Sequence, residues 1–149
     1  MKALIVMAAI ALTSFVSAAH GQPMQCRAGM RKALTEGHFD TPIICSCANA
    51  RFVLAGRTPG NTYSIYDYFY RFLPHPGGVM HGDERLVVFK HGRYIGQYAL
   101  SPPPVSTVTV HGTKVIVTNK EGRERNVLDF SKGPPKRAFL DGYEETFSR

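Results

Sequence analysis

Three cysteines, Cys26, Cys45 and Cys47, are the residues of this sequence whose chemistry depends most on the surrounding compartment. In an oxidising compartment two of them should form a disulfide, and the odd number leaves one thiol over. Cys45 and Cys47 are two residues apart in a β-like run, so both would point to the same face of a strand. Joining them directly would span Cα atoms about 6.5 to 7 Å apart, at the limit of disulfide reach. We therefore predict a disulfide between Cys26 and either Cys45 or Cys47, with the third thiol buried and free or open to exchange with a partner.

The residue that begins the chain after removal of a leader could bind a metal. Cleavage of a leader after Ala19 leaves His20 first, and its amine and imidazole together offer two nitrogen ligands to copper. In this one residue the chain resembles copper-binding secreted proteins that have a histidine brace. Cleavage after Ala18 removes the resemblance. A copper or other metal-binding periplasmic protein that uses His20 is therefore an alternative function.

Two further histidines lie in a segment rich in glycine and proline. His75 and His81 stand near Asp83 at a loop spacing that could also collect a metal. However, His91 and His111 each precede a glycine in a turn-like pair, so this chain uses histidine for purposes other than ligation. Because ligand types without a fixed spacing are unspecific, we expect no metal site and no cofactor.

A tyrosine-rich segment near the middle of the chain has the composition of an interface. Tyrosine, phenylalanine and arginine are enriched at the centres of protein interfaces. The rings are too many for one face of a helix to bury, which favours some exposure, and two basic residues on a nearby hairpin would form a rim. The residues predicted to bind a partner are Tyr66, Tyr68, Tyr70, Arg71, Lys90 and Arg93.

Motifs of the common enzyme classes are absent from the sequence. There is no G-x-S-x-G, no H-E-x-x-H, no Walker loop and no dinucleotide fingerprint. The acids Asp67, Asp83 and Glu84 are expected at the ends of elements, where caps and turns favour them. We therefore expect a non-enzyme. A thiol redox protein that uses Cys45 and Cys47 remains a further alternative.

The first eighteen residues have the anatomy of a secretory signal peptide. Lys2 is a short positive region, residues 3–12 are apolar, and small residues at 16–18 form a cleavage site after Ala18 or Ala19. Thr13 and Ser14 interrupt the apolar run after roughly ten residues, well short of a membrane span. We predict residues 1–18 as a removed signal and a soluble periplasmic or secreted protein.

The remaining residues 19–149 have the size of a single domain, and their charge indicates what they could bind. The formal charge of the whole chain is +7, which becomes +6 when Lys2 is removed with the leader. A basic protein ordinarily suggests nucleic acid, but export argues against that partner. Anionic lipid, polysaccharide or an acidic protein fits better, and contact with a membrane surface is compatible with this charge.

Residues 85–130 give the clearest structural pattern of the sequence. Runs rich in valine, isoleucine, tyrosine and threonine alternate with two His-Gly pairs and a Gly-ended turn, which predicts an antiparallel meander of about five strands. In its first hairpin Phe89 should face Tyr94. With that register, Val87 would face Gly96, and Arg85 would face Tyr98. In its second hairpin the valines share a covered side, whereas Thr107, Thr109, Lys114 and Ile116 share a wet one.

The flanking segments predict one or two short helices and less regular structure. Residues 22–36, closed by Gly37, have helical spacing. Residues 61–73 combine a cap at Ser64 with a stop at Pro74, which favours a helix, and the high β propensity of their aromatic residues makes a strand the rival. Residues 42–56 fit either a hairpin or a helix, because periodicity does not separate the two in such short runs. Residues 131–149 are expected to be a surface tail.

These observations define a single α+β domain in which an antiparallel β-meander of about five strands is packed by one or two short helices. The function that they favour is an exported, basic, non-catalytic binding protein. Its partner would be another protein or an anionic envelope component.

Overall fold

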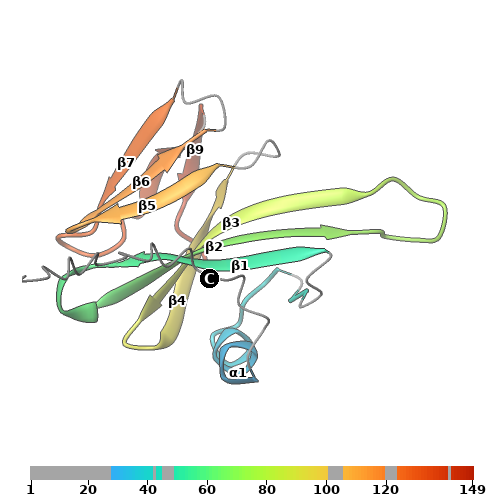
Figure 1. Ribbon diagram of the computed structural model, residues 1–149, viewed down its shortest axis with the longest axis horizontal. Helices are drawn as coiled ribbons and strands as arrows, with labels where there is room; N and C mark the ends of the chain where they lie inside the picture. The colour runs from blue at the N-terminus through green and yellow to red at the C-terminus, as the bar shows by residue number, and fades with distance from the viewer. Residues whose placement is uncertain (1–27, 42, 45–48, 101–105, 120–123, 141) are drawn as a thin grey trace, which may run out of the picture.

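The computed structural model describes residues 28–41, 43–44, 49–100, 106–119, 124–140 and 142–149. The predicted leader, His20 and all three cysteines lie outside these residues, so the disulfide prediction is not tested. Over the described residues the fold is mostly antiparallel β with one short helix, so the α+β prediction is only roughly met (Figure 1). In chain order the elements are α1 (Ala28–Glu36), β1 (Ala50–Arg57), a 3-10 turn (Pro59–Asn61), β2 (Tyr63–Phe72), β3 (His81–Lys90), β4 (Arg93–Leu100), β5 (Thr107–His111), β6 (Lys114–Thr118), β7 (Arg125–Asp129), β8 (Arg137–Leu140) and β9 (Tyr143–Thr146).

The largest sheet has four antiparallel strands in the order β1-β2-β3-β4. β2 and β3 pair along their whole length, from Tyr63 opposite Lys90 to Phe72 opposite His81. The prediction of a helix over residues 61–73 is therefore wrong. Its aromatic side chains recur at every second position as well as at helical spacing, and pairing with β1 and β3 satisfies the backbone of an extended segment.

A second sheet, β5-β6-β7, lies over one face of the first (Figure 1). The predicted single meander thus divides into two sheets between β4 and β5. The sequence there has three consecutive prolines, which lack the N–H that a ladder needs, and residues 101–105 lie outside the described part. The predicted wet side holds for Thr107, Thr109 and Lys114, which are exposed, but Ile116 on that side is buried.

The first hairpin of the predicted meander departs from its expected register. Phe89 does face Tyr94, and the turn residues His91 and Gly92 both have positive φ. A bulge then shifts the ladder between Val88 and Phe89. In consequence Val88 faces Gly96, Val87 faces Gln97, Leu86 faces Tyr98 and Arg85 faces Ala99. A bulge of this kind changes the pairing partner of every residue beyond it. The regular two-residue turn gives no sign of the bulge.

The four-stranded sheet is a central layer with a hydrophobic cluster on each face. The cluster toward β5-β6-β7 includes Ile65, Leu86 and Val115, all fully buried. The cluster toward α1 includes Leu34 and Tyr68. Both faces of the first hairpin are therefore covered, one by the second sheet and the other by α1.

α1 confirms the predicted helix over residues 28–36, and the rest of that prediction lies outside the described residues. The helix does not end with Gly37 in the left-handed region. His38 takes that conformation with φ 59°, and the Phe39 N–H donates to the Leu34 carbonyl. This is the pattern of a Schellman motif, in which a residue other than glycine can occupy the left-handed position.

Segment 42–56 contains β1, so a helix over residues 50–57 is excluded. Ile43 and Ile44 are not in a strand, and residues 45–48 are outside the described part, so the predicted hairpin is not seen.

The C-terminal segment forms a hairpin, β8–β9, that the sequence did not predict. After it, the Ser148 N–H donates to the Gln97 carbonyl of β4, and the Gln97 N–H donates to the Ser148 carbonyl. A Cβ at Gly96 would lie 2.5 Å from the Phe147 ring, so glycine permits this close approach. The chain end is thereby joined to the central sheet.

Candidate functional site

The three tyrosines of the predicted partner-binding set project from one face of β2. Tyr68 and Tyr70 are buried in the cluster that α1 covers, and Tyr66 is half-buried beside them. The rings of Tyr68 and Tyr70 stack with centroids 5.2 Å apart, and the Tyr68 hydroxyl accepts a hydrogen bond of 2.8 Å from the Ile44 N–H. These side chains stabilise the core on that face.

The three basic residues of the set are exposed but lie at two different ends of the sheet. Lys90 and Arg93 flank the β3–β4 turn, and Lys90 pairs with Tyr63 at the start of β2. Arg71 pairs with Gly82 near the other end of β2. Eight residues of strand separate Tyr63 from Arg71, which corresponds to about 26 Å. The predicted set therefore does not form one surface.

The loop histidines are not brought together with other ligands. The His81 ring stacks on Phe72 with centroids 5.6 Å apart, and a ring nitrogen of the exposed His75 lies 3.4 Å from the Pro76 carbonyl. Over the described part of the chain, no three His, Cys, Asp or Glu side chains are grouped as a metal site would require.

The structure adds a feature that the sequence reasoning missed, an arm formed by residues 71–82. Among the described residues, β1 pairs up to Ala50 opposite Tyr70, the Arg71 N–H donates to the Asn49 carbonyl, and β4 pairs up to Leu100 opposite Glu84. Beyond these pairs β2 and β3 continue as a two-stranded ribbon that ends at Phe72 opposite His81 and is closed by residues 73–80. Figure 1 shows this ribbon extending well beyond the rest of the sheet.

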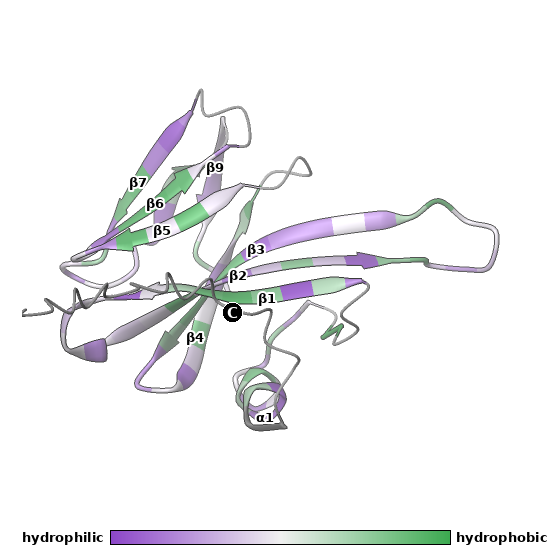
Figure 2. Ribbon diagram, viewed as in Figure 1, coloured by the Kyte–Doolittle hydropathy of each residue, from purple (hydrophilic) through white to green (hydrophobic). Residues whose placement is uncertain are grey.

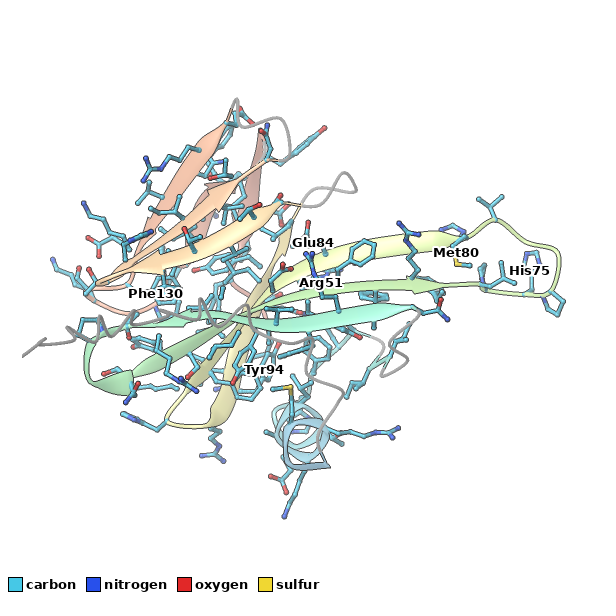
Figure 3. The ribbon with its side chains drawn as sticks, in the orientation of Figure 1. Arg51, His75, Met80, Glu84, Tyr94 and Phe130 are labelled. Carbon is cyan, nitrogen blue, oxygen red and sulfur yellow. The ribbon has the colours of Figure 1, made fainter. Side chains whose placement is uncertain are left out.

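The arm tip, residues 73–80, carries apolar side chains in solvent. Leu73 is 47% exposed, Val79 77% and Met80 53%. These are three of the six large exposed hydrophobic residues in the described part of the chain, and the other three lie on β7, β8 and β9. Figure 2 marks hydrophobic residues within the loop that joins β2 to β3, and Figure 3 shows His75 and Met80 at the same end of the molecule. Aliphatic residues in a Pro- and Gly-rich loop were a sequence signal for this surface.

Stacked rings connect the arm to the core. Tyr70 stacks on Phe72 with centroids 6.0 Å apart, and Phe72 stacks in turn on His81. The Tyr70 hydroxyl donates to Asp83, which is also paired with Arg85. Burial first, and then the Asp83 charge, raises the pKa of Tyr70 to about 12. The base of the arm is thus held by these ring contacts and by the ion pair between Asp83 and Arg85.

A second unpredicted cluster lies between the two sheets, where Arg51, Asp67 and Glu84 meet (Figure 3). An Arg51 guanidinium N–H donates to Asp67 over 2.6 Å, and the same nitrogen lies 3.6 Å from Glu84. The Glu84 side chain is completely buried. Asp67 and Glu84 thus lie within paired strands, and the expectation that they occupy element ends is wrong.

Burial and mutual proximity favour the protonated form of the two carboxyl groups of this cluster. One oxygen of each, Oδ1 of Asp67 and Oε1 of Glu84, is buried without a donor from another residue, and the two groups are within hydrogen-bonding reach of each other. A proton held between them satisfies both oxygens, and two adjacent buried carboxylates would repel each other. Burial is the largest cause that raises the pKa of Asp67, and it raises the pKa of Glu84 to about 8.

This cluster acts between the sheets. The Ser106 N–H, just before β5, donates to the other Glu84 oxygen over 2.9 Å, so Glu84 ties the second sheet to the first. A pocket of about 350 Å³ lies beside it, lined by Arg51, Asp67, Ser106 and apolar residues. Glu84 itself does not line that pocket. The buried acid therefore has a structural partner in Ser106, whereas Asp67 lines the pocket.

Comparison of the chain with models of protein families, with curated proteins and with solved structures finds no match. Within the described residues, no helix is long and apolar enough to cross a membrane.

Proposed function

We propose that this chain is an exported, non-catalytic binding protein that contacts another protein or an anionic envelope component through the β2–β3 arm. The observation that carries the proposal is the exposure of Leu73, Val79 and Met80 at the end of a projecting ribbon. Isolated apolar residues on a surface are normal, but several on one projecting element mark an interaction site.

The ring contacts at the base of the arm support this role. Tyr70, Phe72 and His81 stack along the ribbon, and these contacts hold the strand pair from which the tip projects. Arg71 lies over the Phe69 ring at 5.3 Å and is exposed. It is the one residue of the predicted partner-binding set that is part of the arm, and its charge suits an anionic partner.

The other candidate sites support a non-catalytic reading. Glu84, the acid with the most shifted pKa, accepts a hydrogen bond from the Ser106 N–H within the sheet interface. That contact gives Glu84 a structural role, and burial rather than this hydrogen bond raises its pKa. Perturbed acids occur in structural ion-pair networks as well as in active sites.

The proposal is tested by removing the apolar tip. A triple variant with Leu73→Ser, Val79→Ser and Met80→Ser should lose most of the retention of envelope extract that the wild-type protein shows, because the contacting surface becomes polar. Both the protein and the lipid retained on the immobilised chain are measured. Equal retention by the triple variant would contradict the proposal.

A matched control changes the other three exposed apolar residues, through Val127→Ser, Phe139→Ser and Tyr143→Ser. They are 53%, 62% and 65% exposed, similar to the tip residues, but lie on β7, β8 and β9. The control variant should retain as much as the wild type. If both triple variants lose retention equally, the effect is general surface hydrophobicity and the arm has no special role.

A further inference from the structure

We propose that the partner of the arm is an anionic lipid surface, into which the tip inserts Leu73, Val79 and Met80 at the level of the headgroups. This inference rests on the proposed function, because it names the partner of the same arm.

The kind of apolar residue at the tip favours lipid over a protein partner. A stable protein interface buries about 800 Å² on each side and has aromatic and arginine anchors at its centre. Here the exposed tip residues are aliphatic, whereas the rings of Tyr70 and Phe72 stack on each other at the base of the arm. A few aliphatic side chains on a narrow ribbon are too small a surface for such an interface. They suit insertion about 5–10 Å into the boundary between headgroups and acyl chains, where no shape complementarity is needed.

The charge of the arm complements an anionic surface. From residue 68 to residue 82 the chain has no aspartate or glutamate, and it has Arg71, His75 and His81. Asp83, the first acid after this stretch, is paired with Arg85. Without the predicted leader the chain carries a formal charge of +6. Basic groups next to inserted apolar ones are attracted by the negative potential of an anionic leaflet.

The shape of the arm lets the tip reach a flat surface. Residues 71–82 extend beyond β1 and β4, so a planar bilayer can approach the tip without meeting those strands first (Figure 1). The ladder of β2 and β3 continues to the last pair, Phe72 and His81, and holds the tip away from the body. The ribbon therefore carries its apolar end to the bilayer with Arg71 just behind it.

The test uses the absence of tryptophan from the sequence, which makes an introduced tryptophan a unique fluorescent probe. Val79→Trp should show a blue shift with vesicles of phosphatidylcholine containing about 30% phosphatidylglycerol, and none with phosphatidylcholine alone. Val127→Trp on β7 is the matched control and should not shift with either. A shift of Val127→Trp equal to that of Val79→Trp, or no shift of Val79→Trp, would overturn the proposal.

Vesicle flotation measures the binding itself. The tip variant with three serines should bind anionic vesicles at least roughly ten-fold less than the wild type, since the inserted area is lost. Arg71→Glu should weaken binding several-fold at low salt, and about 0.5 M NaCl should reduce wild-type binding because exposed charges are screened. Wild-type binding that is indifferent to lipid charge and to salt would overturn the proposal.

The outcomes separate this inference from the proposed function. If the tip variant loses retention of an envelope protein while the wild type ignores anionic vesicles, the lipid inference fails and the proposed function stands. If the tip substitutions change neither retention nor vesicle binding, both fail. If Val79→Trp is already buried in vesicle-free solution and the wild type sediments as a dimer through the arm, a second copy is the occupant and the lipid inference is overturned.

Discussion

At the scale of single residues, the protonation of Glu84 links stability to pH. Its folded-state pKa is raised from 4.5 to about 8, chiefly by burial, so the folded protein holds a proton that the unfolded chain releases across this window. The folded state then binds more protons, and the free energy of unfolding falls as pH rises from about 4.5 through about 8. Asp67, whose pKa is also raised, acts in the same direction.

Glu84→Gln should reduce the decrease in the free energy of unfolding between about pH 4.5 and about pH 8. The amide cannot ionise, yet it can accept from the Ser106 N–H, as Glu84 does, and it can donate to Asp67, as a protonated Glu84 could. The wild type should lose a few kcal/mol across the window, since one pKa unit corresponds to about 1.4 kcal/mol, and the variant should lose much less. Urea unfolding of both proteins at several pH values measures this. Parallel pH profiles would contradict a protonated Glu84 in the folded state.

The chemistry of Glu84 was not predictable from the sequence, because the sequence does not reveal which acid lies between two sheets. Asp67 and Glu84 meet only because β2 and β3 pair in one register and Ser106 approaches from the second sheet. An acid next to a turn-rich segment is usually a cap, and that local reasoning failed here. The aliphatic residues of the tip were visible in the sequence, but their exposure depends on how far the ribbon extends.

At the scale of elements, β2 is a core strand, and this changes what its tyrosines are expected to do. Tyr68→Ala should destabilise the domain by about 3–5 kcal/mol, since it deletes a fully buried ring between Phe52 and Tyr70. Arg71→Ala, at an exposed position on the same strand, should cost under about 1 kcal/mol. Chemical unfolding compares the two. Similar small losses for both would show that β2 is not packed as described.

The elements differ in how far local sequence determined them. For β5 and β6 the sequence predicts that the valines share one side of the hairpin, because they alternate strictly around a tight turn. β2 was not, because its aromatic residues fit both a helix and a strand, and only the long-range pairing with β1 and β3 decides between them. The register shift between β3 and β4 was not predictable either, because it also depends on a long-range contact. Gly96 faces Val88, and the Phe147 ring packs against Gly96 from the end of the chain.

At the scale of the whole molecule, the division into two sheets determines what is free to bind. β5-β6-β7 covers one face of the central sheet, and α1 covers part of the other, so the faces of the central sheet are largely committed to the core. The arm is what extends beyond this packing. The binding surface that we propose therefore lies at an end of the molecule, on the arm.

The most direct measurement of the central claim removes the arm tip without disturbing its base. Phe72 and His81 face each other at the end of the ladder, so residues 73–80 can be replaced by Asn-Gly, which forms a two-residue turn between paired strands. The shortened protein should unfold at nearly the wild-type temperature and lose binding to both envelope extract and anionic vesicles. A shortened protein that folds and still binds as the full chain does would contradict the account.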